Sequence, residues 1–142
     1  MSFDFAMTLP LVLVVDPNVA SRHFLWRVLS RAFGVVEAGS GLAARQWIDQ
    51  RPDLGALIVQ EDLPDERGLE LVRTLASAKN PIASRAILLA RPGPDHGDGS
   101  DLGPTMLHPE DVRAILCKLG TWLLPPDAAP ARDLQRDVER LG

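Results

Sequence analysis

The chain has 142 residues, of which 46% are hydrophobic and 24% are charged, and its formal net charge is −4. This composition suits one globular domain and excludes a disordered chain, while the negative charge argues against a surface built to grip nucleic acid. The single cysteine excludes an internal disulfide framework and a cysteine-based zinc site. The longest apolar run, residues 9–15, is too short to span a bilayer and follows no basic segment. We therefore expect a soluble, cytoplasmic protein that binds neither nucleic acid nor membrane.

Short aliphatic runs alternate along the chain with segments whose apolar residues have helical spacing. The runs are typical of buried strands, and the spaced segments are typical of amphipathic helices. In chain order, the pattern predicts a strand at 11–15, a helix at 21–33, a strand at 35–38, a helix at 42–51, a strand at 54–59, a helix at 69–75, strands at 86–90 and 105–107, and a helix at 110–124. Because parallel strands need crossover connections, this order predicts an α/β fold with a five-stranded parallel sheet.

Three segments fall outside this alternation. Residues 1–9 have no periodicity and are predicted to be an N-terminal tail. Residues 91–104 are rich in Gly, Pro, Asp and Ser, which favours a loop over a helix. Residues 125–142 begin as a proline-rich linker and end in a short amphipathic helix. The predicted domain therefore spans residues 10–124.

The carboxyl ends of the predicted strands carry the candidate functional residues. In parallel α/β sheets, ligands bind where the strands end. The residues at these ends are Asp16, Gln60, Ala90 and His108. We expect any chemistry of this chain to depend on them.

Several segments resemble the receiver domains of two-component response regulators. VLVVDPN resembles the family's first strand and its acidic pair, and PDLGALIVQEDLPDERGLELV resembles its third strand and phosphoacceptor loop. ILLAR and LHPEDV resemble the fourth strand and the step into the last helix. The resemblance covers roughly residues 10–124. It implies a doubly wound, flavodoxin-like sheet with strand order 2-1-3-4-5, in which a loop replaces the family's fourth helix, and it implies a role in phosphorelay signal transduction.

The pocket residues differ from those of that family at five positions. Gln60 stands where receivers have the phosphoryl-accepting aspartate, and a neutral carboxamide is too poor a nucleophile to form an acyl phosphate. Pro17 replaces the second acid beside Asp16, so one carboxylate remains for a magnesium ion. The family's hydroxyl, aromatic and lysine positions correspond to Ala90, Thr105 and His108. We therefore predict a pseudo-receiver that is not phosphorylated, is not an enzyme, and holds neither a metal ion nor another cofactor.

Alternatives to this interpretation involve other residues of the same pocket. Asp62 or Glu61 could accept the phosphoryl group instead, although strand alternation points Glu61 to the opposite side of the sheet. A small ligand near Asp16 and His108 is a further alternative. We also expect an Asp16–His108 contact in place of the family's Asp–Lys contact, unless Asp16 is solvated or caps the helix that begins near Asn18. By the same resemblance, the bond between His108 and Pro109 is expected to be cis.

Two tryptophans are candidate interface residues. The helical phase of Trp26 places it off the core stripe, which predicts partial exposure. That stripe is expected to contain Phe24, Leu25, Val28 and Leu29. The first and last helices share one face in the receiver fold, so Trp26 and Trp122 could form one apolar patch, unless Trp122 closes the core. The expected role is a protein-interaction module whose partner is a histidine kinase, a phosphotransfer protein or another regulator, and a homodimer is also possible.

Overall fold

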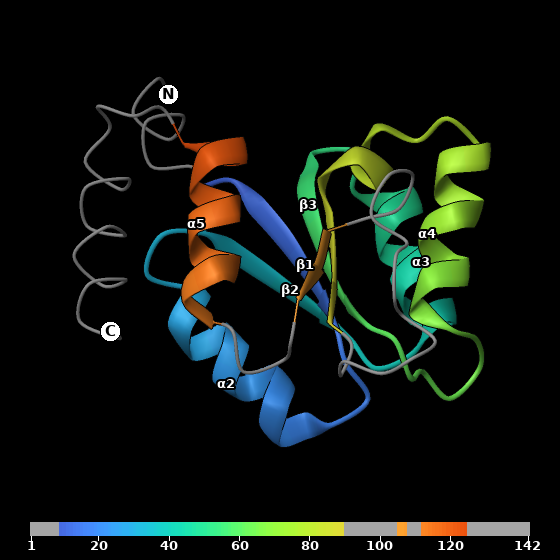
Figure 1. Cartoon of the computed structure of the whole chain (residues 1–142), viewed down its shortest axis with the longest axis horizontal. Helices are drawn as coiled ribbons and strands as arrows, with labels where there is room; N and C mark the ends of the chain where they lie inside the picture. Colours follow the sequence, from blue (N-terminus) through green and yellow to red (C-terminus); the bar gives the residue numbers. More distant parts are fainter. Residues whose placement is uncertain (1–8, 90–104, 108–111, 125–142) are drawn as a thin grey trace.

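The structure, a computed structural model, describes residues 9–89, 105–107 and 112–124 (Figure 1). Its strands are β1 (Leu11–Val15), β2 (Gly34–Ala38), β3 (Leu54–Gln60), β4 (Ala86–Leu89) and β5 (Thr105–Leu107). Its helices are α2 (Val19–Leu29), α3 (Gly41–Gln50), α4 (Gly68–Ser77) and α5 (Val112–Leu123), with a short 3₁₀ helix, η1 (Pro81–Arg85), before β4. Residues 1–8 of the predicted tail, the loop expected in place of a fourth helix, and the C-terminal linker and helix lie outside the described residues.

The five strands form one parallel sheet in the order β2-β1-β3-β4-β5, which confirms the predicted fold class and strand order. β1 lies between β2 and β3, and Val15 pairs with Ala38 on one side and with Val59 on the other. The pairing of Gln60 with Leu89 continues the same edge into β4. The carboxyl ends of β1, β2, β3 and β4 are therefore level with one another.

Helices cover both faces of the sheet, as Figure 1 shows, with α2 and α5 on one face and α3 and α4 on the other. Successive strand residues point to opposite faces, so each strand contributes to two separate cores. The core under α2 and α5 includes Val12, Val14, Leu25, Leu29, Ile58, Ile115, Leu116 and Leu119. The core under α3 and α4 includes Leu13, Val15, Ala44, Ile48, Leu57, Val59, Leu71 and Leu75. Burying each large side chain contributes about 1.5–3 kcal/mol, and this drives the two-sided packing.

The first helix differs from its prediction at both ends and on one face. It begins at Val19, two residues earlier than expected, because the Asn18 side chain caps it by accepting a hydrogen bond from the Ser21 N–H (3.0 Å). It ends at Leu29 rather than at residue 33. Phe24, expected in the core, is 50% exposed. Successive helical residues are rotated by about 100°, so when Leu25 points at the sheet Phe24 lies on the flank.

Candidate functional site

Asp16 follows β1 at the centre of the sheet edge and is only 2% exposed. Its Oδ1 accepts a hydrogen bond from the backbone N–H of Asn18 (2.9 Å). Its Oδ2 has no hydrogen-bond partner among the described residues. Burial raises the pKa of this carboxyl group, and the Asn18 N–H, the Gln60 side chain and the charge of Arg22 oppose that rise. The carboxyl end of β1 therefore holds a buried carboxylate with only one of its oxygens hydrogen-bonded.

Gln60, the last residue of β3, lies beside Asp16 because Val59 pairs with Val15 in the sheet. Its side chain is partly buried and is close enough to lower the pKa of Asp16, although it makes no hydrogen bond to Oδ2. The structure thus brings together the two strand-end residues that the sequence singled out. A neutral amide in this place offers hydrogen bonds but no nucleophilic carboxylate.

Arg22 also holds this edge, and sequence reasoning did not identify it. Its Nη1 donates to the backbone carbonyl of Asp16 (2.6 Å) and its Nε donates to a carboxylate oxygen of Glu37 (3.0 Å). The arginine therefore connects the ends of β1 and β2. Its position one turn into α2 gave no sequence signal, because both partners come from other elements.

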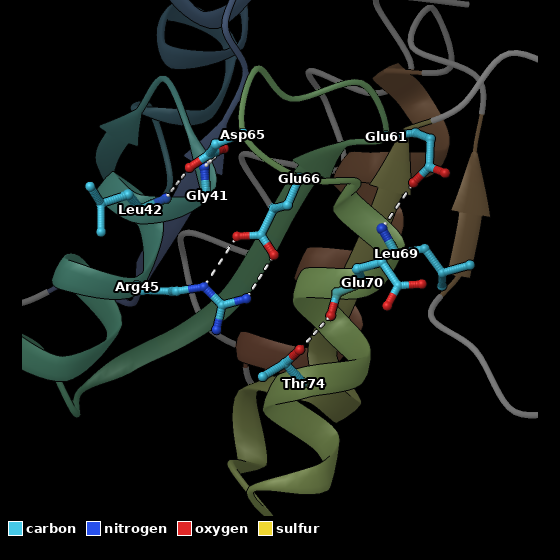
Figure 2. Close-up of polar contacts among 9 residues, drawn as sticks. All are labelled: Gly41, Leu42, Arg45, Glu61, Asp65, Glu66, Leu69, Glu70 and Thr74. Carbon is cyan, nitrogen blue, oxygen red and sulfur yellow. Dashed lines mark hydrogen bonds and ion pairs between the residues drawn. The ribbon is translucent and has the colours of Figure 1, made fainter.

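Glu61 is 4% exposed and points to the start of α4 (Figure 2). Its carboxylate accepts hydrogen bonds from the Leu69 N–H (2.9 Å) and from Nε of Arg67 (2.7 Å). An anion at this place satisfies a free N–H of the helix and interacts favourably with the helix dipole. Both oxygens of Glu61 are therefore already engaged in holding α4.

Asp62, by contrast, is exposed, and no hydrogen bond or ion pair engages its side chain within the described part of the chain. Its backbone pairs with Arg67 across the loop. Of the two acids next to Gln60, Asp62 is the one whose carboxylate is accessible to a small reagent.

The remaining predicted pocket residues are placed only in part. Pro17 is exposed between Asp16 and the helix cap, and the backbone of β5 places Thr105 beside Ile87 of β4. Ala90 and His108 lie outside the described residues. The expected Asp16–His108 contact and the cis bond at His108 therefore stay predictions.

The donor set does not fit the magnesium ion that the receiver resemblance implies. Magnesium binds charged oxygens in an octahedral array. At this edge one carboxylate, Asp16, lies beside a carboxamide, and the Glu61 carboxylate is engaged elsewhere. No cluster of three or more potential metal ligands occurs in residues 9–89 and 112–124. One carboxylate beside a carboxamide is too weak a donor set for magnesium.

Contacts between the β3–α4 loop (residues 61–67) and α3 are the main feature that sequence reasoning missed. Asp65 accepts hydrogen bonds from the backbone N–H groups of Gly41 (2.8 Å) and Leu42 (2.9 Å), as Figure 2 shows. Glu66 binds Arg45 through both of its oxygens (3.1 and 2.7 Å). We call these five residues the loop anchor. It connects the segment that follows Gln60 to a helix on the same face of the sheet.

The electrostatics of the loop anchor favour its charged form. The N–H groups of Gly41 and Leu42 hold the pKa of Asp65 below its usual value, and the Glu66 carboxylate raises the pKa of Arg45. A Cβ atom on residue 41 would lie 2.0 Å from Glu66 Oε2, so only glycine leaves room for this approach. The helix start and the loop are therefore matched in both charge and shape.

The two candidate interface tryptophans have different surroundings. Trp26 is 39% exposed, which confirms its predicted partial exposure, and its ring stacks on His23 with centroids 5.6 Å apart. Trp122 is partly buried and packs on the core under α2 and α5, and Nζ of Lys118 lies 5.6 Å from its ring centroid. No contact joins the two rings in the described structure. Trp122 therefore contributes to the core, and Trp26 contributes to the surface.

Among the described residues, no helix is long and apolar enough to cross a membrane. No protein-family model matches the sequence, and no curated protein matches it.

Solved structures, however, are similar over most of the chain. A response regulator receiver protein from Pseudomonas putida is 27% identical, with a TM-score of 0.68 over 80% of this chain and 98% of that one. A CheY-like receiver domain from Methylobacillus flagellatus is 23% identical, with a TM-score of 0.69 over 80% and 98%. The receiver domain of Ssk1 from Saccharomyces cerevisiae, solved with the histidine phosphotransfer protein Ypd1, is 17% identical, with a TM-score of 0.67 over 81% and 89%. The chain therefore has the flavodoxin-like, CheY-like receiver fold, and its structural neighbours are response-regulator receiver domains.

Proposed function

We propose that this chain is a pseudo-receiver: a receiver domain in two-component signalling that is not phosphorylated and acts by binding a protein partner. The observation that carries the proposal is Gln60, at the end of β3 and beside the buried Asp16. A phosphoryl group needs a carboxylate nucleophile there, and the carboxamide does not supply one.

The same pocket argues against catalysis that depends on a metal ion. Asp16 is a single buried carboxylate next to a neutral side chain, and Glu61 is engaged by Arg67 and Leu69. We therefore propose a domain without magnesium, without another cofactor and without enzyme activity.

Protein binding requires neither the nucleophilic carboxylate nor the metal ion that phosphotransfer needs. One structural neighbour, the Ssk1 receiver domain, was solved in complex with a phosphotransfer protein. We propose a partner of the same general kind for this chain: a phosphotransfer protein, a histidine kinase or another regulator. A second copy of the chain is an alternative partner. Of the two candidate tryptophans, the exposed Trp26 is the proposed contact residue, because Trp122 packs against the core.

Incubation with magnesium and acetyl phosphate, followed by intact mass measurement, tests the proposal. We expect no change in mass, while a phosphorylatable receiver treated in parallel gains one phosphoryl group. A stable gain of one phosphoryl mass by this chain would contradict the proposal.

A second candidate function is phosphorylation at an unorthodox acid. The exposed, unengaged carboxylate of Asp62 favours it. In that case the mass gain would disappear in the Asp62→Asn variant and persist in Glu61→Gln.

A third candidate function is small-ligand binding, which the unpartnered Oδ2 of Asp16 favours. A bound anion or metabolite at the ends of β1 and β3 in an experimental density map would support it. Unchanged affinity for that molecule in Asp16→Asn would argue against this site.

A further inference from the structure

The outward side of α2 carries a concentration of exposed apolar side chains. Of the five large hydrophobic residues exposed in the described structure, Val19 (67%), Phe24 (50%) and Trp26 (39%) all lie within eight consecutive residues of this helix. Single exposed hydrophobic residues are normal on a protein surface, but a contiguous group of them indicates an interaction site.

These side chains lie along two rows of the helix, about 100° apart around its axis. Val19, His23 and Trp26 follow the i, i+4, i+7 spacing, and Phe24 and Arg27 lie on the next row. The fully buried residues of the helix are Leu25 and Leu29, on the side that meets the sheet. Packing in the core therefore does not explain why the exposed rows contain apolar side chains. We call Val19, His23, Phe24, Trp26 and Arg27 the α2 surface.

The charge around the α2 surface is opposite to that of the whole chain. Residues 17–36 contain three arginines, one histidine and no acidic residue, whereas the chain carries a net charge of −4. Arg22 is engaged by Glu37 and by the Asp16 carbonyl. Arg27 is exposed and makes no ion pair within the described residues. An unengaged arginine next to exposed aromatic rings is a typical composition for a protein-binding hot spot.

We infer that the α2 surface binds an acidic segment of a partner protein that also carries apolar side chains. Carboxylates of the segment would bind Arg27, and its apolar side chains would pack on Val19 and Trp26, which share one row. Phe24, on the other row, would extend the contact on the far side of Arg27. This inference rests on the proposed role in protein binding and names the chemistry of the partner. A helix that lies on anionic lipid presents a continuous apolar face to the membrane, whereas the exposed side of α2 intersperses its apolar side chains with His23 and Arg27, which favours a protein.

Peptides selected on the full chain from a random phage-displayed library test this inference. We expect the selected peptides to be enriched in Asp and Glu beside aromatic or aliphatic residues. Trp26→Ser and Arg27→Glu should each weaken their binding by about tenfold or more. Leu42→Ser, which alters a comparably exposed hydrophobic residue on α3 (62%), is the matched control and should leave binding unchanged. Thermal melts of all three variants check that each one folds.

Several outcomes would overturn the inference. Selected peptides without acidic residues, peptides that bind wild type and both α2 variants equally, or a library that yields no binder would each do so. Binding to phosphatidylserine vesicles that the α2 variants abolish, in the absence of an α2-dependent peptide, would assign the surface to lipid instead.

The phosphorylation assay has an independent readout. A chain that gains a phosphoryl group yet binds acidic peptides through α2 would contradict the proposed function alone.

Discussion

The β3–α4 loop and the α2 surface both lie outside the two cores, yet their side chains have different surroundings. In the loop, Glu61, Asp65 and Glu66 each bind N–H groups of a neighbouring helix or an arginine side chain. On α2, the exposed rings of Phe24 and Trp26 contribute nothing to either core. Hydrogen bonds and ion pairs that are fully formed hold a surface segment in one conformation. Exposed apolar rings, by contrast, can still pack against a partner protein. We therefore assign the loop to stability and α2 to recognition.

Gly68→Ala should produce the largest effect, because it acts where the loop enters α4. A Cβ atom there would lie 2.3 Å from the Gln60 carbonyl oxygen and 2.9 Å from Leu88 Cδ1. We expect the free energy of unfolding to fall by about 3 kcal/mol, measured by urea denaturation. Gly39→Ala is the control, since its Cβ would meet only the flexible end of Arg22 at 3.3 Å. Equal effects of the two variants would contradict the close approach of α4 to β3.

Glu61→Ala should produce the next largest effect. It removes a buried carboxylate that binds both Leu69 and Arg67, so we expect a loss of about 2 kcal/mol in unfolding free energy. The control is Glu70→Ala on α4, whose exposed side chain forms an i, i+3 ion pair with Arg73. Glu70→Ala should lower the free energy of unfolding by roughly 0.3 kcal/mol. If Glu61→Ala costs no more than Glu70→Ala in urea denaturation, the loop does not stabilise the fold.

Asp65→Ala should release the start of α3 without unfolding the domain. We expect faster hydrogen exchange at the Gly41 and Leu42 amides, because both lose their acceptor. The Ala43 amide, which the Ser40 side chain holds at 3.1 Å, should keep its protection and serves as the internal control.

The pH dependence of this contact follows from the lowered pKa of Asp65. The contact contributes its full stabilisation at pH values above the ordinary aspartate pKa of about 4. This contribution is lost as the pH falls through the lower pKa that Asp65 has in the folded state. Protection at Gly41 and Leu42 should therefore persist at pH 4 and fall only at more acidic pH. Loss of protection between pH 7 and pH 5 would rule out Asp65 as the acceptor.

Asp16 is the exception to the satisfied polar groups of this edge, and its pH dependence should have the opposite sign. Burial raises the pKa of Asp16, so at pH values above its folded-state pKa the ionised carboxylate lowers the free energy of unfolding. As the pH falls, the carboxylate becomes protonated and this destabilisation disappears. We expect the unfolding free energy of wild type to increase relative to Asp16→Asn as the pH is lowered from 7 towards 4. A constant difference across this range, measured by urea denaturation at each pH, would contradict the raised pKa of Asp16.

Substitutions on the α2 surface should have the smallest effect on stability. Phe24→Ser and Trp26→Ser are each expected to change the unfolding free energy by within about 0.5 kcal/mol. Leu25→Ala, on the buried side of the same helix, should cost about 3 kcal/mol. A cost for Phe24→Ser close to that of Leu25→Ala would place Phe24 in the core and remove it from the recognition surface.

The order of the elements and the strand-end pocket could be predicted from the sequence. Hydrophobic periodicity is a local property, so aliphatic runs and helical spacing identify strands and helices without knowledge of their partners. The carboxyl ends of parallel strands meet at one edge, and this rule predicted that Asp16 and Gln60 would be neighbours. The resemblance to receiver domains, and not this rule, implied that a carboxylate is expected at Gln60.

The tertiary structure alone decided which surface residues are engaged. Asp65 lies 24 positions from Gly41, and Glu66 lies 21 positions from Arg45, so no local pattern links them. The exposure of Phe24 depends on which arc of α2 meets the sheet, and helical spacing leaves that choice to packing. The glutamine at the end of β3 can therefore be identified from the sequence, and the resemblance to receiver domains predicts an aspartate in its place. The loop anchor and the α2 surface depend on contacts between distant segments, which exist only once the chain has folded.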